Sequence, residues 1–361
     1  MDIVEATHDY ERWLAAFNPL HADDLDEKHH LMRGENPFAY FRATYCRWAQ
    51  RRSAFGDEWL NAPVVPSVGD LHPENFGTWR DAEGRLCWGV NDFDEAAELP
   101  YANDLVRLAT GVRAAREAGA IEVRMGFACA AILAGYRAGL KAGGIPFVLE
   151  ELHAELRALA MTREREPKKF WDKLAAQMAS AATAIPADVR LLLNESLPAD
   201  AERAELRFRE KVGVGSLGKA RYLAVATWAG GTVAREAKRL TPSVDVWLGG
   251  EPAESQACRI AAAAVRCPDP FLMFHERWIV RRLAPRSSRI ELEFLKPTTD
   301  LAVLLTAMGT ETANVHLGRR DCAADVLDDL DARPVEWLKH AVRAASRDID
   351  EDRKVWRSRA G

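Results

Sequence analysis

The chain has 361 residues, of which 48% are hydrophobic and 29% are charged, and its formal net charge is -5. This composition is typical of a soluble globular protein with a sizeable core and excludes a disordered chain. The 49 basic and 54 acidic residues are well mixed along the sequence, which argues against a dedicated nucleic-acid-binding protein.

No apolar run reaches the length of a membrane span, and the acidic first residues lack the apolar core of a signal peptide. The six cysteines are scattered and form no C-x-x-C pair, which is typical of free thiols in a reducing compartment. We therefore expect a cytoplasmic protein without a membrane partner.

Helical spacing of apolar residues predicts a helical region over residues 22–53, and short strands with loops follow over residues 63–100. The first polar loop, "VGDLHPENFGTW", lies between apolar flanks that predict a buried strand leading into a turn. Asp70 and Asn75 have the D-x-x-x-x-N spacing of a phosphoryl-transfer loop, in which the carboxylate addresses the attacking hydroxyl and the amide oxygen binds Mg²⁺. This spacing is common by chance, so other segments must support it.

The second polar loop lies in "WGVNDFDEA", residues 88–96. Asp92 follows an apolar strand and precedes an aromatic residue, as does the metal-binding aspartate of kinases, and Asp94 would be a second metal contact. The alternative is an aspartate turn that caps the strand end. Glu95 and Glu98 are expected to be solvated or, alternatively, to bind a cationic substrate.

From residue 104 to about 198 the pattern is strongly helical, with Ala, Leu and Arg at helical spacing. At about residue 204 it changes to a glycine-rich turn followed by alternating residues, with "AGG" as a hairpin turn. A helix is expected at 251–266, then the strands "PFLMFHE" and "RWIVRRLA", and residues 298–361 are helical again. A small β-rich lobe therefore interrupts a helical lobe.

The glycine-rich turn "GVGSLG" matches G-x-G-x-x-G with Gly213, Gly215, Ser216 and Gly218. A dinucleotide-binding loop needs a following helix, but "ARYLAVATW" reads as a strand. A Walker A loop needs a hydroxyl at the position of Ala220. A kinase hairpin over ATP phosphates fits better, with Lys238 as the phosphate-pairing lysine of a later strand. The alternative is a plain glycine-rich hairpin with a surface lysine.

The catalytic and metal segments precede the glycine loop and lysine, which reverses the order of ordinary kinases. A circular permutation accounts for this reversal, and it is physically reasonable when the original termini lie close together. The expected fold is therefore α+β, a bilobal protein-kinase-like fold that is circularly permuted, with a small antiparallel-sheet lobe inserted in a mostly helical large lobe. The expected lobes are a large lobe at 1–200, a small lobe at 201–285, and a hinge with completing helices at 286–361.

The motifs resemble those of aminoglycoside phosphotransferase-like kinases. "GDLHPEN" looks like their "GDLHxxN" loop, and "NDFDEA…PYANDLVRL" resembles their metal-aspartate segment and the helix after it. The set "NPFAYFRA", "VGDLHPENFG", "NDFDEA", "VGVGSLG", "KRLTPSV" and "VHLGRRD" resembles the bacterial domain of unknown function 2252 family over about residues 36–321. The resemblance implies a kinase-like fold and leaves the substrate open.

By this resemblance Asp70 is the catalytic base, Asn75 and Asp92 are Mg²⁺ ligands, and Lys238 pairs with the α- and β-phosphates of ATP. The glycines of the loop would let backbone N–H groups approach those phosphates. Asp104 is interpreted as a helix N-cap or a brace for the catalytic loop.

Other positions have less definite roles. His72 is expected to hydrogen-bond to the loop backbone or to touch phosphate, His316 to pack, and Arg42 to brace a helix or reach substrate. Val68 stands where such loops often have histidine, which weakens the bracing of the backbone. The glutamate that should pair with the lysine is not evident, although Glu251 and Glu254 are candidates.

The expected activity is an ATP- and Mg²⁺-dependent phosphoryl transfer to a hydroxyl of an unidentified small-molecule acceptor. One alternative is transfer of AMP instead of phosphate. A second is a nucleotide-binding pseudokinase that acts as a scaffold, and a third is a small-molecule binding module that does not use ATP. No nucleic-acid partner is expected.

Overall fold

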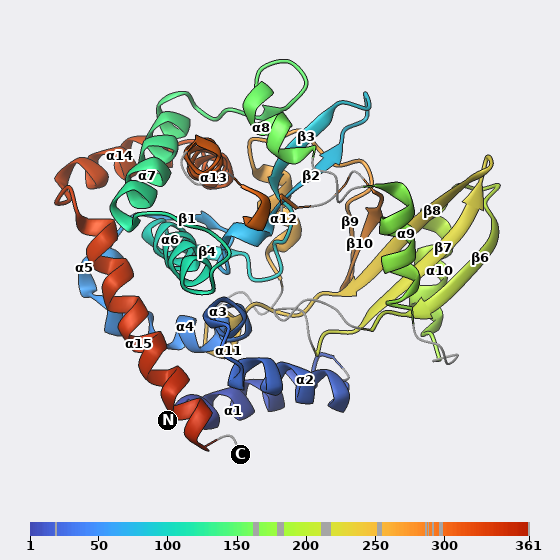
Figure 1. The fold of residues 1–361 in the computed structure, drawn as a ribbon, viewed down its shortest axis with the longest axis horizontal. Helices are drawn as coiled ribbons and strands as arrows, with labels where there is room; N and C mark the ends of the chain where they lie inside the picture. Colours follow the sequence, from blue (N-terminus) through green and yellow to red (C-terminus); the bar gives the residue numbers. More distant parts are fainter. Residues whose placement is uncertain are drawn as a thin grey trace.

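The protein consists of a helical body with a five-stranded antiparallel sheet beside it (Figure 1). Two smaller antiparallel sheets lie within the body, so the expectation of an α+β protein is confirmed. The structure is a computed structural model, which describes residues 1–18, 20–161, 166–178, 184–210, 218–250, 255–285, 287, 289–290, 292–295 and 299–359.

Short helices begin the chain: α1 (Ile3–Ala15), α2 (Ala22–Arg33), α3 (Pro37–Ala43), α4 (Tyr45–Arg51), η1 (Arg52–Phe55) and α5 (Asp57–Leu60). The helical region expected at 22–53 is thus divided. Asn36 caps α3 by accepting hydrogen bonds from the N–H groups of Phe38 and Ala39, and Pro37 occupies the first turn. Proline has no N–H for a preceding helix but fits a first turn, so a new helix begins there.

The two polar loops leave the ends of strands in the small sheets. One sheet pairs β1 (Val64–Ser67) with β4 (Ala97–Pro100), and the other has the order β2 (Phe76–Arg80), β3 (Leu86–Val90), β5 (Phe147–Val148). The first loop follows β1 and passes through η2 (Pro73–Asn75), whereas the second follows β3. Both loops therefore emerge from buried strands.

Long helices form the core of the body: α6 (Ala102–Glu117), α7 (Met125–Lys141), α13 (Thr299–His316), α14 (Cys322–Ala332) and α15 (Trp337–Arg359). α7 and α13 approach each other closely because glycines line their contact. A Cβ atom on Gly309 would lie 2.0 Å from the carbonyl oxygen of Ile132, and one on Gly135 would lie 1.9 Å from that of Thr306. This close packing joins residues far apart in the sequence.

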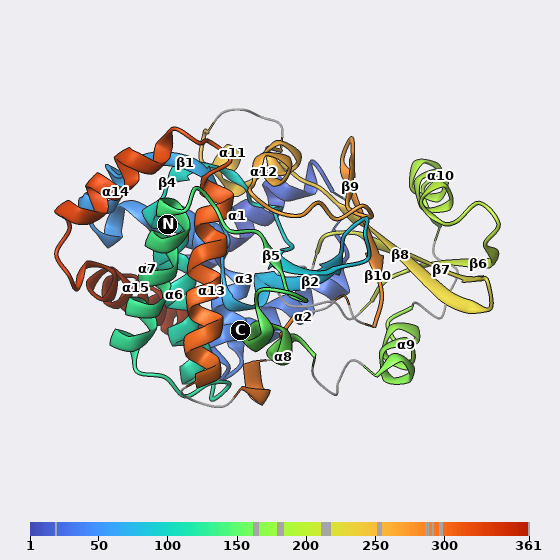
Figure 2. The ribbon, with the colours of Figure 1, turned by 90° about the horizontal axis from the view of Figure 1, so that it is seen from above.

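The larger sheet has the strand order β6 (Glu202–Phe208), β7 (Arg221–Trp228), β8 (Gly231–Arg239), β10 (Trp278–Leu283), β9 (Met273–His275). Apolar side chains on one face pack against α10 (Ala187–Ser196). Because strand side chains alternate, the other face carries Glu236 and Lys238 of β8, and α9 (Pro167–Ala175) packs beside them. Figure 2 shows α9 and α10 beside the sheet.

The remaining helices are α8 (Ala154–Ala160), α11 (Val244–Trp247), α12 (Ala257–Ala263) and η5 (Leu292–Phe294). α12 is shorter than the helix expected at 251–266, and residues 251–254 lie outside the described residues. Near the two ends of the chain, Arg359 of α15 contacts Asp2 at 2.7 Å. No helix within the described ranges combines the length and apolar character that crossing a membrane requires.

Candidate functional site

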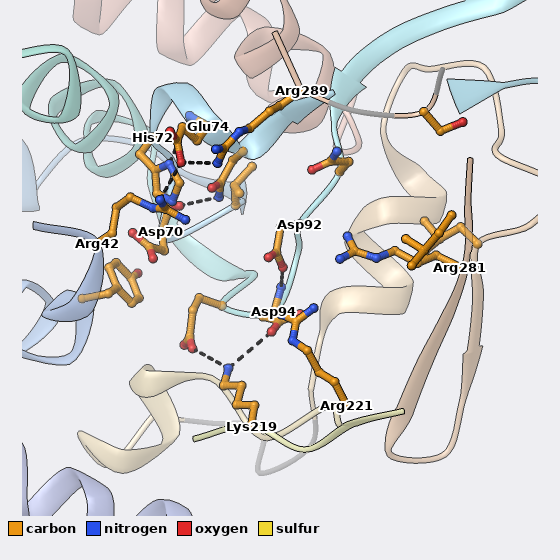
Figure 3. Close-up of a pocket in the computed structure, with 18 of the residues that line it drawn as sticks. Arg42, Asp70, His72, Glu74, Asp92, Asp94, Lys219, Arg221, Arg281 and Arg289 are labelled. Atoms are coloured by element: carbon orange, nitrogen blue, oxygen red, sulfur yellow. Dashed lines mark hydrogen bonds and ion pairs between the residues drawn. The ribbon is translucent and has the colours of Figure 1, made fainter. Parts of the chain in front are cut away.

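A cavity of about 400 Å³ is lined by residues of the helical body, both polar loops and the larger sheet (Figure 3). This volume lies in the range of small-molecule binding sites. Asp70, Asn75, Asp92 and Asp94, which the sequence singled out, all line it.

The first polar loop is anchored by Asp104 at the start of α6. Its carboxylate accepts hydrogen bonds from the backbone N–H groups of Val68 at 2.7 Å and Gly69 at 3.0 Å. His316 of α13 lies 3.2 Å from the same carboxylate and also contacts the Tyr136 hydroxyl at 2.7 Å. Asp104 is therefore a brace for the loop, one of the two expected roles. His316 does more than pack, because it supports that brace from a distant helix.

Asp70 is held by Arg107 of α6. The Arg107 guanidinium donates to Asp70 Oδ1 at 2.8–2.9 Å, and it stacks 3.5 Å from the centre of the Phe41 ring. Burial raises the pKa of Asp70, although the charges of Arg107 and Arg42 oppose that effect. The carboxylate thus faces the cavity in a fixed orientation.

Asn75 and His72 shape the same loop. Asn75 Nδ2 donates to the carbonyl oxygen of Asp70 at 2.6 Å, so its amide oxygen is not used in that contact. The N–H of Glu74 donates to His72 Nδ1 at 3.2 Å, which matches the first of the two expected roles of His72, a hydrogen bond to the loop backbone. Burial lowers the pKa of His72 well below its ordinary value, so the ring is neutral at pH 7.

The second polar loop meets the sheet through Lys238. Its ammonium lies 3.0 and 3.1 Å from the two Asp92 oxygens and also pairs with Asp94. Burial alone would raise the pKa of Asp92, but the Lys238 charge, a hydrogen bond with Asp94 and the nearby arginines together outweigh burial and lower it. Arg235 of β8 donates instead to the Ser196 carbonyl at the end of α10, whereas Lys238 faces the loop.

A second lysine, which sequence reasoning missed, lies beside Lys238. Lys219 Nζ is 3.4 Å from Asp94 Oδ2 and 3.3 Å from Glu95 Oε1. Glu95 also accepts the N–H of Val244 at 2.8 Å, and burial raises its pKa to about 7. The expectation that Glu95 is solvated is therefore wrong, because its side chain is only 11% exposed and contacts Lys219 and the Val244 N–H. Glu98 is partly exposed and contacts Arg259. In the sequence, the position of Lys219 directly after the glycine loop could have indicated that it belongs to the site.

The described end of the glycine loop turns toward the N-terminal helices. Gly218 has a φ of +87°, its carbonyl accepts from Asn18 at 2.6 Å, and its N–H donates to Asp24. Gly218 does not line the cavity, unlike Lys219. Gly213, Gly215 and Ser216 lie outside the described residues, as do Glu251 and Glu254.

Three arginines surround Glu236 on the cavity side of the sheet. Glu236 has no exposed surface and pairs with Arg221 at 3.1 Å, Arg281 at 2.7 Å and Arg209. These cations lower the pKa of Glu236 well below its ordinary value, although burial opposes them. Period-two alternation puts Glu236 and Lys238 on one face of β8. Arg221 and Arg281 belong to the neighbouring strands β7 and β10, and Arg209 directly follows β6. The arginine partners of Glu236 could be identified only from the pairing of the strands in the structure.

Oxygen atoms suited to binding a metal ion occur among the side chains of the two polar loops. Asp94 Oδ1 is buried and has no hydrogen-bond partner among the described residues, and the Asp92 carboxylate lies beside it. Asn75, whose side chain carries an amide oxygen, lines the same cavity. Mg²⁺ prefers such hard oxygen ligands, so this set fits it.

Comparison with known proteins adds one finding. Residues 22–184, less than half of the chain, match the family described as "Uncharacterized protein conserved in bacteria (DUF2252)". This match supports the resemblance over the helices and polar loops up to residue 184. No curated protein and no solved structure matches the chain.

Proposed function

We propose that this protein is a Mg²⁺- and ATP-dependent phosphotransferase that acts on a hydroxyl of a small-molecule acceptor. The observation that supports this proposal best is the convergence of Asp70, Asn75, Asp92 and Lys238 on one region, although 168 positions separate the first from the last in the sequence. The kinase-like, circularly permuted fold is part of the proposal. The five-stranded sheet, which is inserted between two parts of the helical body along the chain, supports it.

In this proposal the acceptor oxygen attacks the terminal phosphorus of ATP, and the bond from that phosphorus to the bridging oxygen breaks to leave ADP. The hydroxyl proton passes to Asp70, which Arg107 orients. Lys219 and Lys238 would stabilise phosphate charge. Mg²⁺ held by Asn75, Asp92 and Asp94 would supply further neutralisation of that charge.

Calorimetry with Mg²⁺ and ATP tests the nucleotide site. The wild type should bind, and Asp92→Ala and Lys238→Ala should each weaken binding at least tenfold, because each removes a charge next to the phosphates. Asp328→Ala and Lys141→Ala, at exposed positions of the helical body, are matched controls that should leave binding unchanged. A folded wild type that shows no binding would refute the proposal and favour the binding module without ATP.

The reaction type is tested next with ATP labelled at the α- or the γ-phosphorus and a panel of hydroxyl acceptors. Label from the γ-position in the product supports phosphoryl transfer, and label from the α-position identifies AMP transfer instead. Asp70→Asn should lower turnover about 10²- to 10⁴-fold while nucleotide still binds. A pseudokinase would bind nucleotide without turnover on any acceptor. In that case Asp70→Asn would leave nucleotide binding unchanged.

A further inference from the structure

Two cysteines lie close together in the structure although 180 positions separate them in the sequence. Cys87 is on β3, and Cys267 follows α12 in the connection to β9. Their sulfur atoms lie within 4.8 Å of each other and of a carboxylate oxygen of Asp81, and neither cysteine is in a disulfide. Two neighbouring thiols can bind a metal ion together or form a disulfide when they are oxidised.

The surroundings of the two thiols disfavour a metal ion. Asp81, the third possible ligand, already uses both carboxylate oxygens. Its Oδ1 accepts the N–H groups of Glu83 at 3.0 Å and Arg85 at 2.9 Å, and its Oδ2 accepts the Arg85 guanidinium at 2.7–2.8 Å. The charges of Arg85 and Arg266 act on both sulfur atoms. Guanidinium groups repel a divalent cation but stabilise a thiolate, so this environment suits thiol oxidation.

The two cysteines differ in their access to solvent. Cys267 is partly exposed, whereas Cys87 has no exposed surface. Burial and the neighbouring Cys267 raise the pKa of Cys87 to about 12, so its thiol is protonated at pH 7. An oxidant from solvent therefore reaches Cys267 first, and Cys87 is placed to react with the oxidised sulfur.

Cys87 is fixed in a sheet, whereas Cys267 lies outside any helix or strand. β3 lies between β2 and β5, where Cys87 pairs with Trp79 and Val148. Cys267 belongs to the connection at 264–272, which leads from α12 to β9. An S–S bond of about 2.05 Å requires the two sulfur atoms to approach by less than about 3 Å. Side-chain rotation and a shift of this connection can supply that approach.

The connection is already held to the body just before Cys267. The N–H of Val265 donates to the carbonyl oxygen of Asn314 on α13 at 2.9 Å. Arg266, which lines the cavity, donates to the carbonyl oxygen of Val90 at 2.5 Å. After Cys267 the chain leaves the body for the five-stranded sheet. A bond from Cys267 to β3 would therefore extend the attachment to the point where the chain leaves the body.

We propose that Cys87 and Cys267 are a peroxide-responsive thiol pair that forms a reversible disulfide and fixes the connection between body and sheet. The Cys267 sulfur attacks one oxygen of hydrogen peroxide, the O–O bond breaks, and a sulfenic acid and water form. The Cys87 sulfur then attacks the Cys267 sulfur, the S–S bond forms, and the S–O bond breaks to release a second water. The thiols lose two electrons, the peroxide gains them, and both thiol hydrogens end in water. A dithiol reverses the change by thiol–disulfide exchange. This proposal does not depend on the phosphotransferase function.

Peptide mapping of the full-length protein tests the disulfide. Protein that has been reduced and freed of reductant is treated with hydrogen peroxide at about one equivalent. Two thiols should be lost, unreduced digests should contain one cross-linked peptide pair with Cys87 and Cys267, and a dithiol should restore both thiols. Cys258→Ser, which removes an exposed cysteine of α12, is the matched control and should form the same disulfide. Oxidation of Cys258 in the wild type without any link between Cys87 and Cys267 would overturn the inference.

Two variants test the order of the steps. Cys87→Ser should leave Cys267 as a sulfenic acid that dimedone traps, because the second thiol is missing. In Cys267→Ser, oxidation of Cys87 should be at least tenfold slower than in the wild type, and an equal rate would contradict the order. If Cys87→Ser does not fold, the wild-type map and Cys267→Ser still decide. Calorimetry with Zn²⁺ tests the alternative, because binding to the reduced wild type that is at least tenfold weaker in Cys267→Ser would identify a metal site instead.

Hydrogen exchange tests what the disulfide does to the connection. Backbone amides of residues 267–275 should exchange at least threefold more slowly in the oxidised wild type than in the reduced protein. Cys87→Ser that has been treated with peroxide in the same way should show no such change. Equal exchange in the oxidised and reduced wild type would overturn the view that the bond fixes the connection between body and sheet.

Discussion

The helical body and the five-stranded sheet each contain a carboxylate with no exposed surface, and they stabilise it in different ways. Asp104 in the body accepts from two backbone N–H groups and contacts His316. Glu236 in the sheet is surrounded by three arginines. The partners of Asp104 fix the shape of a loop, whereas those of Glu236 create a surplus of positive charge. The body therefore provides geometry for the site, and the sheet provides a field that suits an anion.

The largest effect is expected when Glu236 is neutralised. Glu236→Gln leaves three arginines close together without a counter-charge and should lower the free energy of unfolding by about 3–5 kcal/mol in urea denaturation at pH 7. Since the pKa of Glu236 is depressed in the folded state, its stabilisation is complete above the unfolded pKa of about 4.3 and is lost as the pH falls.

Two controls test the origin of that effect. Glu205→Gln removes an exposed carboxylate of β6 and should change stability by at most about 1 kcal/mol. Added phosphate should stabilise Glu236→Gln more than the wild type if the arginines then bind an external anion. Equal stabilisation of both proteins would contradict the view that the sheet face is a region of excess positive charge.

A smaller loss is expected for Asp104→Asn. The amide oxygen can replace only part of the carboxylate, and its NH₂ group faces donors, so a buried N–H loses its partner. The free energy of unfolding should fall by about 2–3 kcal/mol, measured by urea denaturation. Asp325→Asn at an exposed position should stay within about 0.5 kcal/mol of the wild type. An equally small change for Asp104→Asn would mean that the brace is not needed for folding.

The close contact of α7 and α13 supports the brace, because these helices supply Tyr136 and His316. Gly309→Ala places a methyl group 2.0 Å from the Ile132 carbonyl oxygen and should cost about 1–3 kcal/mol of stability. Gly126→Ala, on α7 with open space around it, is the matched control and should be neutral or stabilising. Thermal unfolding would compare the melting temperatures of the two variants. Equal melting temperatures would contradict the view that Gly309 is needed for the close packing of α7 and α13.

A pH dependence from Glu95 is expected as a gradual change and not as a single loss of stability. Its folded pKa of about 7 exceeds the unfolded value, so the folded state binds more protons and stability falls as the pH rises from about 4.5 to 7. The slope for one proton is at most about 1.4 kcal/mol per pH unit. Glu95→Gln should flatten the curve in urea denaturation from pH 5 to 8, and Glu122→Gln, which is exposed, should not. A slope that is unchanged in Glu95→Gln would show that other groups cause it.

The sequence by itself indicated the polar residues of the two loops and the strand character after the glycine loop. These features depend on local patterns: Asp70 and Asn75 lie in one turn, Asp92 follows an apolar strand, and alternation defines the faces of β8. The α+β class followed from the same patterns.

The tertiary structure alone decided which distant side chains complete these groups. Arg107 reaches Asp70, His316 reaches Asp104, and Lys219 reaches Asp94 across large separations in the sequence. The buried state of Glu95 and the arginines around Glu236 also arise only when sheet and body meet. Local propensity does not specify these contacts, because a residue's charge environment depends on which segments fold against it, and that is set by packing of the whole chain.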